Sequence, residues 1–318
     1  MAFERDMYYG LSGPDVFAMK TMLLEAGLYA PHIRRIAKES FGSDTLYAVC
    51  ALQKRAGLTP NGVVNAATYA AILAAANAAG EKAELGENAA AGGETGGANA
   101  AVSEEGLLPA NIGGEAAAAI GAELNKAEGK ARAVALDALA FAFDPAVPRD
   151  FPISLYIRGG NLYNKDLTRN VITLARIASG AKSQPEFYDG GRREMMEAAV
   201  RRYPETTGAD CSGGVVGLLR HNGCVAPGFD ATADGFRASG KMRRIDASAL
   251  RPGDLVHRSG HIGLYAGGGY VVEWMGGAYG CQLTRLNDRR SYSFLTGKTG
   301  KLSPWTSFLR PTYYEERT

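Results

Sequence analysis

Apolar residues recur at helical spacing in three stretches near the start of the chain. The stretches lie at residues 16–23, 46–52 and 69–73, and each places apolar side chains three or four positions apart. Such positions share one face of an α-helix. The Pro-Asn-Gly sequence at residues 60–62 favours a turn between the second and third stretches. The pattern therefore predicts a compact unit of three helices within residues 10–75.

This hydrophobic pattern stops over residues 77–114, which are dominated by Ala, Gly, Glu and Asn. A segment of that composition cannot bury a core, so we predict a flexible linker whose role is reach. Helical spacing returns over residues 115–143, although Gly121 and Gly129 weaken it. We expect one helix within residues 115–150, a segment to which the sequence assigns no role.

Pro145, Pro148 and Pro152 end helical structure, so a second unit is expected over residues 151–318. Within it the pattern predicts a short strand and three helices, at residues 153–157, 167–179, 194–202 and 211–223. Two apolar stretches joined by an Ala-Gly-Gly reversal predict a β-hairpin over residues 261–274. The expected fold class is α+β for this unit, next to a small all-α domain.

The register of the hairpin decides which of its side chains meet. If Tyr265 pairs with Gly269 across a three-residue loop, His261 lies directly opposite Glu273. Directly opposed residues of antiparallel strands have Cβ atoms about 4.5–5.5 Å apart. We therefore expect the Glu273 carboxylate to hold the imidazole of His261.

Cys211 is the candidate nucleophile, because the apolar residues behind it predict that it begins a helix. Unpaired N–H groups at a helix N-terminus stabilise a thiolate and can hold an oxyanion. A lone cysteine is more often a buried, inert side chain. The expected histidine base, oriented by a carboxylate, favours a catalytic triad of Cys211, His261 and Glu273 over an inert cysteine.

Composition narrows the alternatives. A net charge of +2 and a pI of 8.3, with basic and acidic residues interspersed, exclude a nucleic-acid footprint. The sequence contains no run of about 18 apolar residues, so it predicts no membrane span. Four widely spaced cysteines suggest neither a zinc site nor a disulfide framework. His257 and His261 are four apart but flank a turn, so we expect no metal, and no cofactor is indicated.

The start of the chain lacks the basic and apolar stretches of a signal peptide, which predicts synthesis in a cytoplasm. The sequence does not indicate an oligomeric state.

The first unit resembles the three-helix peptidoglycan-binding domain of bacterial cell-wall hydrolases. The similarity rests on Gly13, Asp15-Val16, Phe41-Gly42, Leu52-Gln53 and Asn61-Gly62-Val63, in that order. It departs at Met19-Lys20, where Leu-Gln is usual, and at Asn61, where Asp is common. The resemblance implies a wall-anchoring domain over residues 1–76, with peptidoglycan as the partner.

The second unit resembles the NlpC/P60 family of cysteine peptidases. The similarity rests on Asp210-Cys211-Ser212-Gly213, Pro252-Gly253-Asp254-Leu255, the His261-Ile-Gly-Leu-Tyr sequence and the polar residue twelve positions after that histidine. It implies a papain-like fold and cleavage of peptidoglycan stem peptides, commonly between D-glutamate and the diamino acid. Cys211 would be the nucleophile, His261 the base and Glu273 the third member.

Two features depart from that family. The third member is usually His, Asn or Gln, whereas this chain has Glu273. A Tyr-x-x-Gly-Gly motif usually precedes the cysteine, and its tyrosine acts at the oxyanion; we match it to residues 187–191, with Tyr188 next to the expected position. The resemblance also suggests that Asp210 and Ser212 contact substrate. Trp274 is a weaker candidate for a substrate contact, with a position in the core or in the groove wall as the alternative.

An anchoring domain, a linker and a thiol peptidase, without a signal peptide, are similar in arrangement to a bacteriophage endolysin. That resemblance implies accumulation in the cytoplasm and release to the wall through a holin-type pore. A tail-associated lysin remains an alternative. So do an amidase or acyltransferase on the same scaffold, and a degenerate wall-binding protein without activity.

Overall fold

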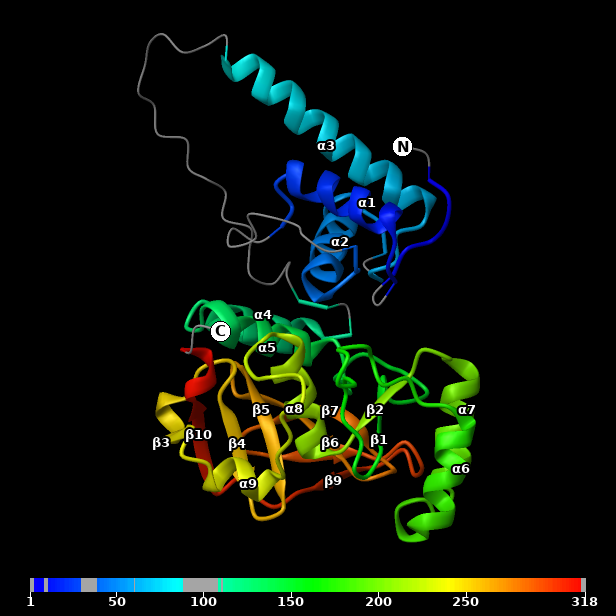
Figure 1. The fold of residues 1–318 in the computed structure, drawn as a ribbon, viewed down its shortest axis with the longest axis vertical. Helices are drawn as coiled ribbons and strands as arrows, with labels where there is room; N and C mark the ends of the chain where they lie inside the picture. Colours follow the sequence, from blue (N-terminus) through cyan, green and yellow to red (C-terminus); the bar gives the residue numbers. More distant parts are fainter. Residues whose placement is uncertain are drawn as a thin grey trace. The chain divides into compact units, whose positions relative to one another are not determined.

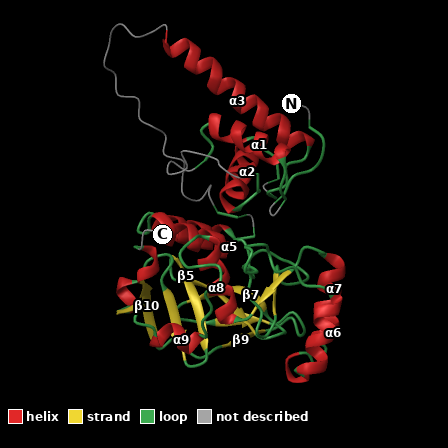
Figure 2. Ribbon diagram, in the orientation of Figure 1, coloured by secondary structure: helices red, strands yellow, loops and turns green. Residues whose placement is uncertain are grey.

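The computed structural model describes residues 3–8, 11–29, 39–59, 61–87, 108–109 and 111–315. Contacts divide the chain into two compact units, residues 1–110 and 111–318. Figure 1 labels their helices and strands, and Figure 2 shows that the strands belong to the second unit. None of the described helices is long and apolar enough to cross a membrane.

The first unit is helical, as its hydrophobic pattern predicts. Its described helices are α1 (Pro14–Glu25), α2 (Ser43–Arg55) and α3 (Ala66–Glu87). One face of each helix contributes to a single core, with Val16, Val49 and Ile72 at its centre. The buried Gln53 side chain fixes the turn before α3, because it accepts a hydrogen bond from Gly62 N and donates to Val63 O.

Helix α3 extends beyond the domain boundary predicted at residue 76. The helix continues to Glu87, so the first part of the predicted 77–114 linker is helical. Alanine favours helix strongly, and a run of alanines propagates a helix without a core to pack on. Most of the remaining predicted linker lies outside the described residues.

The second unit is built around an antiparallel sheet of six strands in the order β3-β10-β4-β5-β6-β7. These strands are β3 (Met242–Ile245), β4 (Leu255–Arg258), β5 (His261–Gly267), β6 (Tyr270–Met275), β7 (Gly280–Arg285) and β10 (Ser307–Pro311). Two smaller pairs accompany them, namely β1 (Ser154–Tyr156) with β2 (Thr207–Ala209) and β8 (Arg290–Tyr292) with β9 (Thr299–Lys301).

Helix α8 (Cys211–His221) packs against β5 and β6 through small residues at its start. A Cβ on Gly214 would come within 2.3 Å of the Trp274 ring, so the helix lies directly on that ring. Helix α8 also contacts α5 (Gly129–Leu139), and both α4 (Gly114–Leu124) and α5 contact β5 (Figure 1). The short helix α9 (Ala233–Ala238) contacts β3, β4 and β5.

Residues 111–150 belong to this unit rather than forming a separate segment. They contain α4 and α5 in place of the single helix predicted, because Gly129 takes a positive φ where the second helix begins. The Glu123 carboxylate of α4 accepts hydrogen bonds from Tyr265 Oη at 2.8 Å and Gly268 N at 3.0 Å. The segment therefore supports the β5–β6 turn.

The hairpin register differs from the predicted one by two residues. Tyr265 pairs with Val271 rather than Gly269, and Gly267 pairs with Tyr270 after a bulge. The loop is shortened because Gly268 and Gly269 both take positive φ, as two-residue turns between twisted strands require. A shift of two preserves the face of each side chain, so His261 and Glu273 become diagonal neighbours on the same face.

A long excursion of the chain separates β1 from β2. It contains α6 (Leu174–Ser183), the 3₁₀ turn η2 (Pro185–Phe187) and α7 (Arg192–Arg202). The helix predicted over residues 167–179 begins later, at Leu174, because Thr173 caps it by accepting a hydrogen bond from Arg176 N. Two further 3₁₀ turns follow strands of the six-stranded sheet. They are η3 (Ala247–Ala249), after β3, and η4 (Thr312–Tyr314), after β10.

Candidate active site

Cys211 is the first residue of α8, at the end of β2. Asp210 caps the helix, because its Oδ1 accepts a hydrogen bond from Gly213 N at 2.7 Å. Its Oδ2 accepts another from Gly159 N at 2.9 Å, which ties the helix start to the segment after β1. A Cβ on Gly213 would lie 1.9 Å from the carbonyl oxygen of Gly160, so only glycine allows this close approach. Cys211 is 8% exposed.

His261 and Glu273 meet as the sequence predicts, although through a different register. His261 Nε2 lies 2.7 Å from Glu273 Oε2, and the carboxylate is completely buried. Because Nε2 is engaged in this way, Nδ1 is the ring nitrogen left for Cys211. Thr284 Oγ1 donates a further hydrogen bond to Glu273 Oε1 at 2.5 Å.

Arg289 is a member of this cluster that sequence reasoning missed. Its guanidinium, 5% exposed, donates from Nε to Glu273 Oε1 at 2.9 Å and from Nη2 to Glu273 Oε2. Its Nη1 donates to the carbonyl of Ser303 at 2.8 Å. No local motif marks Arg289, which lies in the irregular segment between β7 and β8, so only the three-dimensional fold reveals it.

Trp305 links the histidine and the arginine from a third segment. Its ring stacks on the imidazole of His261 at 5.4 Å and an interplanar angle of 7°. The guanidinium of Arg289 lies 4.0 Å from the same ring. Stacking on a buried indole restricts rotation of both groups. The imidazole plane is therefore fixed by a ring contact as well as by Glu273.

The surroundings of His261 raise its pKa to about 9. Burial acts in the opposite direction, but hydrogen bonds with Cys211 and Glu273 and their negative charge outweigh it. Burial disfavours the charged form of Glu273 and by itself would raise its pKa. Arg289 and His261 outweigh burial and hold the pKa of Glu273 well below the usual range. At neutral pH the cluster therefore contains an imidazolium, a carboxylate and a guanidinium.

The turn between β4 and β5 is held from the side by Asp234 of α9. Both carboxylate oxygens accept from Gly260 N at 3.2 Å, and Oδ1 lies 2.9 Å from His257 Nε2. Gly260 immediately precedes His261, and its carbonyl oxygen is 4.0 Å from Cys211 Sγ. His257 thus serves to anchor the turn that carries His261.

Tyr156 is the second functional candidate that sequence reasoning missed. The Tyr-x-x-Gly-Gly spacing that we matched to residues 187–191 occurs without offset at residues 156–160. The structure places this copy beside the cysteine, since Tyr156 pairs with Ala209 and Gly160 O accepts from Asp210 N at 2.9 Å. About fifty residues separate Gly160 from Asp210 along the chain, so the sequence did not indicate that this copy of the motif lies next to Cys211. Burial, and then Cys211 and Asp210, raise the pKa of Tyr156 to about 12.

The other predicted substrate contacts divide into two groups. Asp210 and Ser212 are partly exposed next to Cys211, and Ser212 Oγ donates to Asp210 Oδ1 at 3.0 Å. Tyr188 is 3% exposed in a core with α6 and α7, and Trp274 is 1% exposed beneath α8. These two side chains support the fold and do not face a groove, which corrects their assignment as substrate contacts.

The comparisons with known proteins bear on the first unit. Residues 12–72 match the family model of the peptidoglycan binding domain. No curated protein and no solved structure matches the chain. The peptidoglycan-binding domain supports peptidoglycan as a partner and a cell wall as the place of action.

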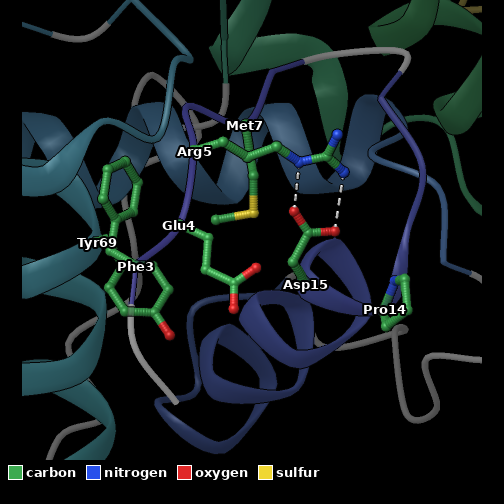
Figure 3. Close-up of a pocket in the computed structure, with 7 residues that line it drawn as sticks. All are labelled: Phe3, Glu4, Arg5, Met7, Pro14, Asp15 and Tyr69. Atoms are coloured by element: carbon green, nitrogen blue, oxygen red, sulfur yellow. Dashed lines mark hydrogen bonds and ion pairs between the residues drawn. The ribbon is translucent and has the colours of Figure 1, made fainter.

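A pocket of about 330 Å³ opens on this peptidoglycan-binding domain. Figure 3 shows Arg5 and Asp15 pointing toward one another across it, joined by hydrogen bonds of 2.7 and 3.0 Å. Phe3 and Tyr69 form an aromatic pair in its lining, with ring centroids 5.5 Å apart. The pocket belongs to the first unit, whereas Cys211 belongs to the second.

Proposed function

We propose that this chain is a peptidoglycan hydrolase that cleaves stem peptides by a Cys211–His261–Glu273 thiol mechanism. The observation that carries the proposal is the buried Glu273 carboxylate on His261, with Cys211 at a helix N-terminus on the other side of the ring. The matched peptidoglycan-binding domain supplies the substrate class. The motifs around Cys211 and His261, similar to those of NlpC/P60 peptidases, favour the bond between D-glutamate and the diamino acid.

The first half-reaction transfers the acyl group to the enzyme. An imidazolium beside Cys211 favours the thiolate, which attacks the carbonyl carbon of the peptide bond. As the tetrahedral intermediate collapses, the C–N bond breaks and His261 gives its proton to the leaving amine. The acyl group remains on Cys211 as a thioester.

The second half-reaction restores the enzyme. Neutral His261 removes a proton from water, and the resulting hydroxide adds to the thioester carbonyl. The C–S bond then breaks, which releases the carboxylic acid and returns the thiolate and the imidazolium. Glu273 remains ionised throughout and holds Nε2, so that Nδ1 stays directed at the sulfur and the water.

The oxyanion of each intermediate forms next to the start of α8. The first N–H groups of a helix have no acceptor within it, and they can donate to this oxygen. Tyr156 is a second donor, because a raised pKa keeps its hydroxyl protonated at neutral and mildly alkaline pH. This assignment replaces Tyr188, which lies in a different core.

The test is a digest of purified peptidoglycan with the wild type and with Cys211→Ala, followed by mass spectrometry of the new termini. The expected result is a free D-glutamyl carboxyl group and a free diamino-acid amine with the wild type only. A cut between the glycan and the peptide would identify an amidase instead. No new termini with either protein would contradict hydrolysis and favour a wall-binding protein without activity.

The route to the wall is part of the same proposal. An anchoring domain joined to a thiol hydrolase suits an endolysin that accumulates inside the cell and passes a holin-type pore. Expression in a host with and without a pore-forming protein tests this route. Lysis only when the pore is present is the expected result.

A further inference from the structure

A polar pocket of about 330 Å³ lies beside the nucleophile's helix, separate from the cluster around His261. It begins at Gly159 and Gly160, which bond the helix cap Asp210, and it extends toward Arg220 near the end of α8. From Cys211 to Arg220 the helix rises about 13 Å, at about 1.5 Å per residue. The pocket is therefore within reach of a short peptide held at Cys211.

The charges in its lining are unbalanced. Lys165, Arg176 and Arg220 contribute three cations, and Asp230 contributes one carboxylate. Lys165 and Arg176 are exposed, and neither forms an ion pair within the part of the chain that the structure describes. The amide of Asn161, also in the lining, adds a neutral hydrogen-bonding group.

The positive charge of Arg220 is buried and is held in place by backbone groups. The residue is 3% exposed, and its guanidinium donates to the backbone carbonyls of Phe229 and Tyr163. These acceptors are neutral, and no carboxylate among the described residues bonds to it. A buried cation that bonds no carboxylate is costly, and a bound anion reduces that cost.

We propose that this pocket binds a free carboxylate of the stem peptide while the scissile bond lies at Cys211. The proposal rests on the function proposed above and adds a specificity to it. An extended peptide spans about 3.3 Å per residue, so a carboxylate three or four residues from the scissile bond reaches the cations. Side-chain carboxylates can reach them from nearer positions.

The pocket comes from the long excursion between β1 and β2. That excursion supplies Lys165 and Arg176, whereas Arg220 comes from α8. A chain with a short connection between residues 160 and 210 would keep the catalytic groups and lose two of the three cations. The excursion therefore selects substrate without taking part in the chemistry.

The test compares two synthetic peptides of sequence L-Ala-γ-D-Glu-meso-diaminopimelate-D-Ala. One carries free carboxylates, and in the other every carboxyl group is amidated, namely those of glutamate, of the diaminopimelate side chain and of the terminal D-Ala. Binding of each to Cys211→Ala is measured by calorimetry, and kcat/KM is measured with the wild type. The same measurements follow for Lys165→Ala/Arg176→Ala. Lys182→Ala, which removes an exposed charge from the same helix α6, is the control.

The free peptide is expected to bind about tenfold more tightly than the amidated one, equivalent to about 1.4 kcal/mol. The double variant should lose this preference, and Lys182→Ala should keep it. Equal binding of the two peptides, or an equal loss on both in the double variant, would overturn the pocket. Carboxylate-dependent binding without cleavage by the wild type would instead refute the hydrolase and leave the pocket intact. Cleavage of both peptides without a preference for the free carboxylates would support the hydrolase and refute the carboxylate-binding pocket.

Discussion

At the scale of single residues, the carboxylate of Glu273 serves two cations. It bonds the imidazole of His261 and the guanidinium of Arg289 while fully buried. A buried carboxylate with one partner would hold an imidazolium very tightly and make a poor proton donor. Sharing the charge with Arg289 moderates that hold, so Arg289 is a positioning residue that also tunes His261.

Arg289→Gln should shift the pH dependence of kcat/KM. The pKa of His261 is raised, so its proton, and with it activity, is present at neutral pH and lost as pH rises through about 9. Without Arg289, Glu273 acts on His261 alone, and the alkaline limb should move upward by about one unit. Arg290→Gln, which removes an exposed arginine next in the chain, should leave the limb in place. An unchanged or lowered limb in Arg289→Gln would contradict the shared charge.

At this scale the sequence predicts the candidate cluster of Cys211, His261 and Glu273 but not the residues that support it. The three are marked by a predicted helix start and by a hairpin, which are local features. Arg289 and Trp305 reach the site from irregular segments, and Tyr156 from a strand far upstream, so no local pattern connects them. The excursion between Gly160 and Asp210 also led us to match Tyr188 in place of Tyr156.

At the scale of elements, the site depends on close contact between α8 and the segment after β1. Gly213 at the helix start allows this contact with Gly160, and the neighbouring Gly214 allows the helix to lie on Trp274 of β6. The hairpin was predicted with the correct face and the wrong register, because the positive φ angles of its glycines cannot be read from the sequence. The face survives since strands repeat every two residues.

Gly213→Ala should therefore be strongly destabilising. The added Cβ would lie 1.9 Å from a backbone oxygen, which cannot rotate away as a side chain can. We expect a loss of about 3 kcal/mol in the free energy of unfolding, measured by urea titration. Gly240→Ala adds a Cβ in open space at another position and should change stability by less than about 0.5 kcal/mol. Equal effects of the two substitutions would show that the close contact is not needed.

At the scale of the whole molecule, the proposed catalytic cluster and the matched peptidoglycan-binding domain lie in different units. The Cys211 cluster lies entirely within residues 111–318, and the family match lies entirely within residues 1–110. Sequence composition predicted this division, but it assigned residues 115–150 no role. The role of helices α4 and α5 is visible only in the folded structure, where they pack on the sheet and form contacts such as that of Glu123 with Tyr265.

A protein of residues 111–318 should fold and cleave soluble wall fragments at the rate of the full chain. It should sediment much less with intact walls and lyse them more slowly, because anchoring raises the local concentration of enzyme at an insoluble substrate. Sedimentation and turbidity assays on the two proteins measure this difference. Equal sedimentation would place wall binding in the second unit and remove the anchoring role from the first.

The central claim is that His261 activates Cys211 as a nucleophile, and its most direct test is alkylation without substrate. The rate of iodoacetamide labelling at each cysteine is followed by peptide mass spectrometry in the wild type and in His261→Ala. Burial raises the pKa of Cys224 to about 12 and holds that of Cys281 well above its usual value, so both should remain unlabelled near pH 6. Rapid labelling of Cys211 at that pH, lost in His261→Ala, is the predicted result. Labelling of Cys211 that is equally slow in both proteins would contradict the account.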